Sequence, residues 1–162
     1  QAISDSIYYM EGSMNFLVLG SGEKTVENQL ENLQHQLFGY YNCMIGYNEK
    51  LSHQMYAGAD FLLMPSRVEP CGLNQMYALR YGTIPMVRRT GGLRDTVKDF
   101  GEEDGFGICF NEATVGEICF AVYRAAELFK DKNRMELLRK RAMEINHSWE
   151  QSAEIYINLY EA

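Results

Sequence analysis

The segment from residue 59 to residue 82 constrains the fold of this chain more than any other. Residues 59–64, ADFLLM, form a short and almost wholly apolar run, which is typical of a parallel strand buried on both faces. From Gly72 onward, apolar residues recur at roughly helical spacing until Gly82, which stands where a helix C-cap is favoured. The polar residues 65–71 therefore connect the C-terminal end of a strand to the N-terminal end of a helix. Open α/β sheets bind their ligands at that edge.

This loop carries a carboxylate, a thiol and a glycine. Glu69 precedes Pro70, Cys71 follows it, and Gly72 allows backbone to come close to a ligand. The unpaired N–H groups at the start of the following helix favour an anion. Each residue also has an ordinary explanation, as a solvated glutamate, a half-buried thiol or a turn glycine.

Strand-like and helix-like segments alternate along the rest of the chain, and its 162 residues are enough for one domain. This alternation predicts an α/β fold, with a Rossmann-like parallel sheet flanked on both faces by helices. The only tryptophan, Trp149, is expected to be a packing anchor. The strands are expected near 15–20, 43–46, 60–64, 83–87 and 106–110, and the helices near 24–37, 50–57, 72–82, 114–129, 132–145 and 149–160.

Three further segments at predicted strand ends are candidates for ligand contacts. Residues 20–22, Gly-Ser-Gly, form a possible phosphate loop or simply a tight turn. Tyr47 is a candidate platform for a nucleotide base, with packing as the alternative. Arg88 and Arg89, just before a glycine pair, suggest either an anion site or two solvated charges.

Charge and cysteine usage narrow the class of partner. A net charge of −7 argues against nucleic acid or an anionic membrane as partner, and no apolar run approaches the roughly 20 residues of a membrane span. Four cysteines without a CxxC pair favour reduced thiols in a cytoplasmic protein. His53 has no partner at metal-ligand spacing, so no metal site is expected, and the acidic segment 98–107 is expected to be a solvated surface.

Three motifs together resemble those of bacterial glycogen synthases and plant starch synthases, which are retaining glucosyltransferases of the GT-B fold. They are IGYNEKLSH with the later GAD, PSRVEPCGLNQMYALRYGTIP, and TGGLRDTV. The resemblance runs from about Phe16 to Trp149. It implies that residues 1–162 are the single C-terminal, nucleotide-sugar-binding domain of such an enzyme. The N-terminal acceptor domain would then be absent, and the isolated chain would not turn over.

The resemblance also implies roles for individual residues. Glu69 matches the glutamate that faces the donor glucose, and Tyr47 matches the tyrosine that stacks on the base. Cys71, Gly72 and Leu73 match the turn whose backbone amides meet the sugar hydroxyls and the distal phosphate.

The remaining matched residues lie beside these. Asn74 stands where many relatives have Thr, and both residue types can hydrogen-bond a phosphate. Thr90, Gly91 and Gly92 match the glycine loop beside the sugar-nucleotide pocket. Position 77 is Tyr, so the second glutamate of the broader retaining-transferase pattern is missing.

The implied partners are ADP-glucose or ADP as donor ligand and an α-1,4-glucan, bound through the absent domain, as acceptor. No cofactor is expected. Two alternatives stay open: a non-catalytic sugar-nucleotide-binding module, and another GT-B glucosyltransferase that uses UDP-glucose.

Overall fold

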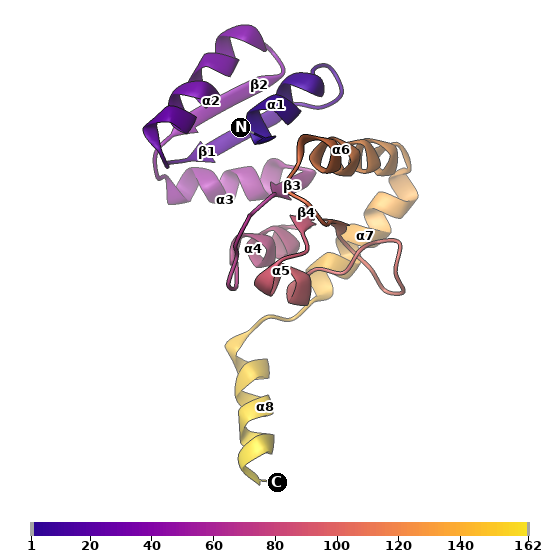
Figure 1. The fold of residues 1–162 in the computed structure, drawn as a ribbon. Coiled ribbons are helices and arrows are strands. Elements are labelled where there is room, and N and C mark those ends of the chain that lie inside the picture. Colours follow the sequence, from indigo (N-terminus) through magenta and orange to yellow (C-terminus); the bar gives the residue numbers. More distant parts are fainter. Residues whose placement is uncertain (1, 162) are drawn as a thin grey trace.

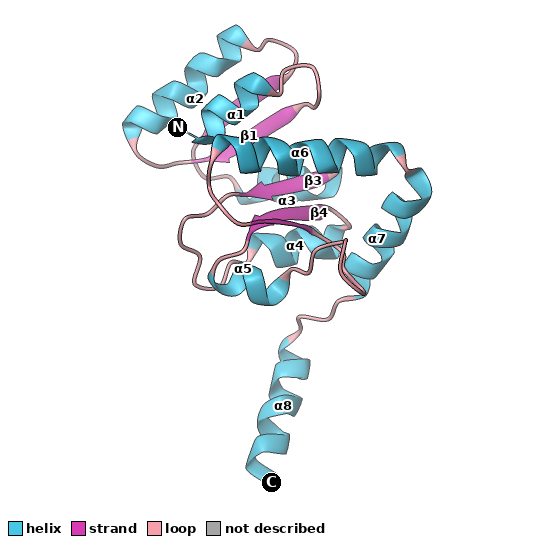
Figure 2. Ribbon diagram, turned by 45° about the vertical axis from the view of Figure 1, so that its right-hand side comes forward, coloured by secondary structure: helices cyan, strands magenta, loops and turns pink. Residues whose placement is uncertain are grey.

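A computed structural model of the chain describes residues 2–161, in which strands and helices alternate as in an α/β fold (Figures 1 and 2). All the strand pairs are parallel, which confirms the predicted fold class. The elements are α1 (Ala2–Tyr9), β1 (Phe16–Gly20), α2 (Lys24–Gln36), β2 (Tyr41–Ile45), α3 (Glu49–Gly58), β3 (Phe61–Met64), α4 (Asn74–Tyr81), β4 (Ile84–Arg88), α5 (Gly91–Thr96), β5 (Ile108–Phe110), α6 (Val115–Lys130), α7 (Lys132–Glu144) and α8 (Trp149–Glu161).

The strands form two hydrogen-bonded sheets where the sequence predicts one. One sheet pairs β1 with β2, and the other has the strand order β3-β4-β5. Side chains provide the continuity between them, because Phe16 of β1 packs against both the apolar cluster under β1 and β2 and the cluster that contains Ile84 of β4. The two sheets therefore share a core, although no backbone hydrogen bonds pair β1 with β3 as strands within residues 2–161.

The three-stranded sheet is buried on both faces, because alternate side chains along its strands enter two different apolar clusters. Ile84 and Ile108 are fully buried against α6 and α7 residues. Val87 and Cys109 instead pack with Leu93 of α5. This period-2 pattern buries both faces of the sheet, and the parallel pairing of β3 with β4 brings their carboxyl ends to one edge.

The helix ends follow local sequence signals. Gly82 ends α4 with a φ of 75°, in the left-handed conformation that glycine adopts without strain, as predicted. Asn48 caps α3 by accepting a hydrogen bond from the backbone N–H of Leu51, at 2.9 Å. No helix within residues 2–161 combines the length and apolarity needed to cross a membrane.

Helix α8 stands apart from the rest of the molecule (Figures 1 and 2). None of its residues is buried, and Trp149 at its first position is 87% exposed. The prediction that Trp149 is a packing anchor is therefore wrong. Large aromatic side chains are usually buried, which is why burial was predicted, but no element of the described structure lies over α8 to bury Trp149.

Candidate functional site

Two loops meet at the edge formed by the carboxyl ends of β3 and β4. Residues 65–73 lead from β3 into α4, and residues 89–90 lead from β4 into the short helix α5. The loops are neighbours because β3 and β4 pair in parallel, with Met64 opposite Val87 near their ends. The structure thus places the PSRVEPCGLNQMYALRYGTIP and TGGLRDTV motifs beside each other, as expected for a ligand-binding edge.

Gly91 and Gly92 bring the two loops into direct backbone contact. The N–H of Gly92 donates to the carbonyl oxygen of Glu69 at 3.1 Å. A Cβ at Gly91 would overlap that same carbonyl, and one at Gly92 would lie 2.6 Å from the Cα of Cys71. Gly91 also has a φ of +45°, which disfavours any side chain. These glycines therefore hold the Glu69 loop in place by close packing.

The carboxylate of Glu69 is half-buried and held by its own loop. Its Oε2 accepts a hydrogen bond from the Ser66 hydroxyl at 3.2 Å, which fixes the direction of the side chain. Its backbone carbonyl is held by Gly92, as described above. Glu69 is thus anchored at both ends, and the residue as a whole is half-buried.

The start of α4 presents backbone amides beside Glu69. Gly72, with a φ of 74°, turns the chain into the helix, and Leu73 at the N-cap provides no side-chain hydrogen bond to the first amides. Leu73 is 56% exposed, and Cys71 and Asn74 are exposed as well. An uncapped helix start carries partial positive charge and suits an anion.

A buried glutamine in α4 was not identified from the sequence as part of the site. Gln75 is fully buried and donates through Nε2 to the carbonyl oxygens of Cys71 and Gly72, at 3.1 and 2.9 Å, and to the Thr96 hydroxyl at 3.0 Å. It shares the buried stripe of α4 with Ala78 and Leu79. A polar residue within that otherwise apolar stripe is the signal that identifies it.

Tyr47 lies in the segment that follows β2, and its side chain is 87% exposed. The carboxyl ends of β1 and β2 are tied together by the Gly46 N–H, which donates to the carbonyl of Gly20 at 2.8 Å. The nearby Gly22 N–H donates to Oε1 of Glu27 at 2.9 Å. An amide that is already satisfied by the following helix favours the tight-turn interpretation of residues 20–22 over a phosphate loop.

Arg88 and Arg89 brace loops and do not form an unpaired anion site. The Arg88 guanidinium donates to the carbonyl oxygens of Arg67, at 2.8 Å, and Asn111, at 2.9 Å. Arg89 forms an ion pair with Glu102. The Arg88 side chain is therefore held by loop carbonyl oxygens, whereas Arg89 and Glu102 form a surface ion pair with side chains 37% and 44% exposed, which agrees with the interpretation as solvated charges. Thr90 follows as the residue before α5, with extended backbone.

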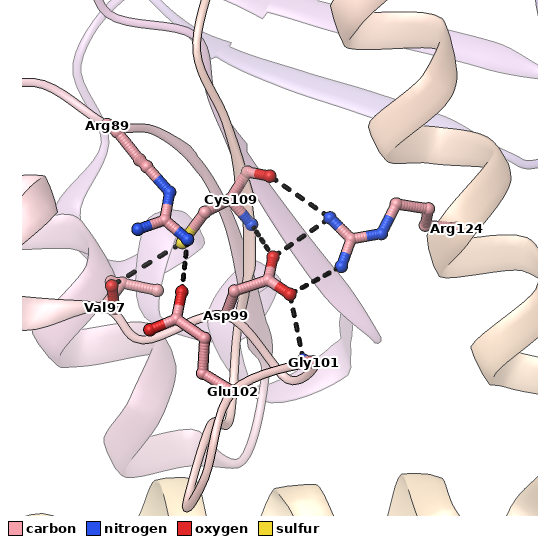
Figure 3. Close-up of polar contacts among 7 residues, drawn as sticks. All are labelled: Arg89, Val97, Asp99, Gly101, Glu102, Cys109 and Arg124. Atoms are coloured by element: carbon pink, nitrogen blue, oxygen red, sulfur yellow. Dashed lines mark hydrogen bonds and ion pairs between the residues drawn. The ribbon is translucent and has the colours of Figure 1, made fainter.

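The acidic segment after α5 is only partly a solvated surface, because Asp99 is 7% exposed. Figure 3 shows its carboxylate between Arg124 and the backbone of Cys109 and Gly101. Its carboxylate accepts two hydrogen bonds from Arg124, at 2.7 and 3.0 Å, and one each from the backbone N–H groups of Cys109 and Gly101, at 2.7 and 2.9 Å. Burial raises the pKa of Asp99, but these four hydrogen bonds outweigh burial and lower the pKa below its ordinary value. The run of acidic residues predicted a solvated surface, and the buried ion pair between Asp99 and Arg124 was missed.

Two observations describe the thiols and possible metal ligands of residues 2–161: Cys109 is buried, whereas Cys71 in the Glu69 loop is exposed. Burial raises the pKa of the Cys109 thiol to about 11, so this cysteine stays protonated at neutral pH. No cluster of three or more His, Cys, Asp or Glu side chains in the described part of the chain is arranged to hold a metal ion. The two-loop edge offers the Glu69 carboxylate, the exposed Cys71 thiol, helix-terminal amides and closely packed backbone.

Sequence comparison identifies the relatives of this chain. A family model described as glycosyl transferases group 1 matches residues 3–144. The chain is 57% identical over 147 residues to the glycogen synthase of Flavobacterium johnsoniae, covering 91% of this chain and 31% of that protein. It is 44% identical over 155 residues to a glycogen synthase of Bacillus cereus, covering 94% and 33%. The chain thus spans about a third of the length of these curated relatives.

Solved structures agree with the sequence comparison. The catalytic domain of Starch Synthase IV from Arabidopsis thaliana, bound to ADP and acarbose, is 34% identical with a TM-score of 0.88, covering 98% of this chain and 34% of that one. Sucrose-phosphate synthase from Thermosynechococcus elongatus is 18% identical with a TM-score of 0.69, covering 99% and 42%, and so shares the fold alone. The chain belongs to the group 1 glycosyl transferases, with the α/β fold of their GT-B members, and its resemblance to the glycogen and starch synthases is confirmed.

Proposed function

We propose that this chain is the donor-binding domain of a synthase that transfers glucose from ADP-glucose to the non-reducing end of an α-1,4-glucan, with retention of configuration. The observation that carries the proposal is the backbone contact of Gly91 and Gly92 with the loop of Glu69, at the start of α4. The contact supports the proposal because the Glu69 loop leads directly into α4, whose first amides have no side-chain cap. Such an edge suits a ligand that has both hydroxyl groups and phosphates.

The leaving group explains why amides belong at this edge. When the bond from glucose to the diphosphate breaks, negative charge grows on the departing phosphate oxygen. The backbone N–H groups of Gly72 and Leu73, and the side chain of Asn74, would stabilise that charge more in the transition state than in the bound substrate. Leu73 is exposed and would contribute through its backbone N–H alone.

Glu69 would act on the sugar. A carboxylate near the anomeric carbon holds a sugar hydroxyl and favours oxocarbenium-like charge, as in glycoside chemistry generally. The hydrogen bond from Ser66 supports this role, because it directs the carboxylate without neutralising it. Position 77 is Tyr, which leaves Glu69 as the carboxylate assigned to this task.

An adenine nucleotide is the proposed donor moiety, with Tyr47 as its platform. Tyr47 is exposed and close in sequence to the joined ends of β1 and β2, so its ring is accessible for stacking on a base. The Arabidopsis starch synthase was solved with ADP. The fold relative HepE from Anabaena was solved with UDP-glucose, but at 15% identity it carries no argument about the base.

The acceptor glucan would bind mainly outside this chain. The chain spans about a third of its curated relatives, so the proposed enzyme has a further domain that binds the glucan and closes over the donor. The isolated chain is therefore expected to bind nucleotide without elongating a glucan. Elongation of glycogen by the purified chain at a rate typical of the full enzyme would contradict this part of the proposal.

Calorimetric titration of this chain with ADP, ADP-glucose and UDP-glucose tests the donor assignment. We expect weak binding that prefers the two adenine nucleotides and is lost in Tyr47→Ala. Tyr160→Ala is the matched control, because Tyr160 is equally exposed, at 84%, but lies on α8. Tighter binding of UDP-glucose, or equal loss of binding in both variants, would contradict the assignment of Tyr47 and adenine.

A further inference from the structure

Gln75 occupies a position where packing alone would favour an apolar side chain. It is fully buried on the sheet-facing stripe of α4, beside Ala78 and Leu79. Burying an amide is unfavourable unless its hydrogen bonds are made, and Oε1 of Gln75 has no donor within the described residues. A buried polar group that is retained in this way calls for an explanation beyond filling space.

The hydrogen bonds of Gln75 join the Glu69 loop to helix α5. Nε2 donates to the carbonyl oxygens of Cys71 and Gly72 on one side and to the hydroxyl of Thr96 on the other. Thr96 in turn donates to the carbonyl oxygen of Gly92 at 2.6 Å. The side chains of Gln75 and Thr96 therefore connect the Glu69 loop to Gly92 at the start of α5.

These contacts complete a closed circuit with the backbone contact already described. Gly92 is held from its N–H by the carbonyl of Glu69 and from its carbonyl by Thr96. Gln75 connects Thr96 back to the residues just after Glu69. The circuit ties the backbone of Glu69, and of the residues that lead into α4, to the first turn of α5. These segments carry the groups proposed to act on the donor.

We propose that Gln75 and Thr96 are positioning residues, which clamp the Glu69 loop to the first turn of α5 and so set the geometry of glucosyl transfer. This inference rests on the proposed function. Small displacements of reacting groups lower rates strongly, so the clamp affects turnover more than ground-state binding of the donor.

Isosteric variants of the longer enzyme that contains this chain test the clamp. Gln75→Met and Thr96→Val remove the hydrogen bonds with little change in side-chain shape, whereas Thr96→Ser keeps the hydroxyl. We expect the first two to lower kcat at least about tenfold while KM for ADP-glucose changes less than about threefold. Thr96→Ser is expected to keep most of the activity. The double variant is expected to lose little more than either single variant, because both break one circuit.

The control separates positioning from a general loss of stability. Ile118→Val removes a methyl group from α6, in the fully buried core on the other side of the three-stranded sheet from α5. It is expected to lower the unfolding midpoint with no change in kcat. If Gln75→Met lowered kcat no more than Ile118→Val does, or if Thr96→Ser behaved like Thr96→Val, the clamp would be refuted.

Amide hydrogen exchange gives a readout that does not depend on the substrate. In Gln75→Met we expect peptides that cover 69–72 and 91–96 to exchange at least about tenfold faster, while peptides from α6 keep their protection. Unchanged exchange in both segments would overturn the clamp. If the unmodified enzyme transferred no glucose from ADP-glucose, the proposed function would fail, and the exchange experiment would still decide on the clamp.

Discussion

Glu69 and Asp99 are both acidic residues in loops, yet the structure gives them opposite surroundings. Glu69 is half-buried and accepts a side-chain hydrogen bond from Ser66. Asp99 is nearly fully buried and accepts four hydrogen bonds, two of them from a guanidinium. A carboxylate with few internal partners contributes little to folding, whereas one with many contributes strongly. At the scale of residues, this difference separates a candidate functional group from a structural one.

Replacing Glu69 should therefore affect turnover without affecting stability. In the longer enzyme we expect Glu69→Gln to lower kcat about 100-fold or more, because the amide keeps the shape but loses the charge that would face the sugar. The unfolding midpoint should stay unchanged. Steady-state kinetics and thermal unfolding measure the two effects. Glu103→Gln, at an exposed position of the acidic loop, is the control, and activity equal to that control would remove Glu69 from the site.

Replacing Asp99 should have the opposite result, with a characteristic pH dependence. Because the pKa of Asp99 is lowered by folding, its ion pair stabilises the fold above the unfolded-state pKa of about 3.9, and this stabilisation is lost as the pH falls through the lower folded-state pKa. We expect Asp99→Asn to reduce the free energy of unfolding by about 3 kcal/mol at pH 7, since Arg124 is left without its partner.

Urea unfolding at pH 7 and at pH 3 measures this difference. The deficit of Asp99→Asn relative to the unmodified chain should shrink at the lower pH, where Asp99 begins to take up a proton. Glu136→Gln, which breaks an exposed ion pair with Lys140, should change stability little at either pH. A deficit of the same size at both pH values would show that the charge of Asp99 is not what stabilises the fold.

At the scale of elements, the strands and most helices could be predicted because their signals are local. Apolar runs and turn residues placed β3 and β4, and Gly82 marked the end of α4 within a residue. Helix α5 was not predicted, because two glycines in a row argue against a helix. Those glycines are required by contact with the Glu69 loop, some 20 residues earlier in the chain, and such contacts leave no local pattern.

The same distinction holds for the candidate site. Motif resemblance placed Glu69 and the glycine pair in one site, and the structure brings them together. The link through Gln75 and Thr96 could not be predicted, because it depends on the separation of two loops in space. The partners of Arg88 and Arg89 were missed for the same reason.

Substitution of Gly92 tests whether the contact between the loops is a packing contact. Gly92→Ala should reduce the free energy of unfolding by at least about 2 kcal/mol, because its Cβ would collide with the backbone of Cys71. Gly116→Ala is the matched control, since a Cβ there meets nothing within 4 Å and an alanine favours helix α6. Urea unfolding of both variants measures the contrast. A fully stable Gly92→Ala variant would contradict the close packing of these loops.

At the scale of the whole molecule, one body contains the site and one helix stands outside it (Figure 1). The apolar side chains of α8 are solvent-exposed, among them Ile155 at 65% and Leu159 at 70%. Its sequence is therefore not specified by packing against the described core. The stability of the site should depend on residues 2–144 and not on α8.

Deletion of residues 149–162 tests this separation. We expect the free energy of unfolding to change by less than about 0.5 kcal/mol, because no residue of α8 within the described structure is buried. The deletion should also raise solubility, since it removes exposed apolar surface. Urea unfolding and the concentration dependence of light scattering measure the two effects. A stability loss of more than about 1 kcal/mol would mean that α8 packs on the body in solution.

The contact of Gly91 and Gly92 with residues 69–71 has a consequence for motion. A surface loop that is free at its tip moves on the nanosecond to microsecond timescale. The Glu69 loop instead shares backbone contacts with α5 and cannot move far without carrying that helix along. Its opening is therefore a local unfolding event, and the proposed donor nucleotide would be exchanged for the next with this loop in place.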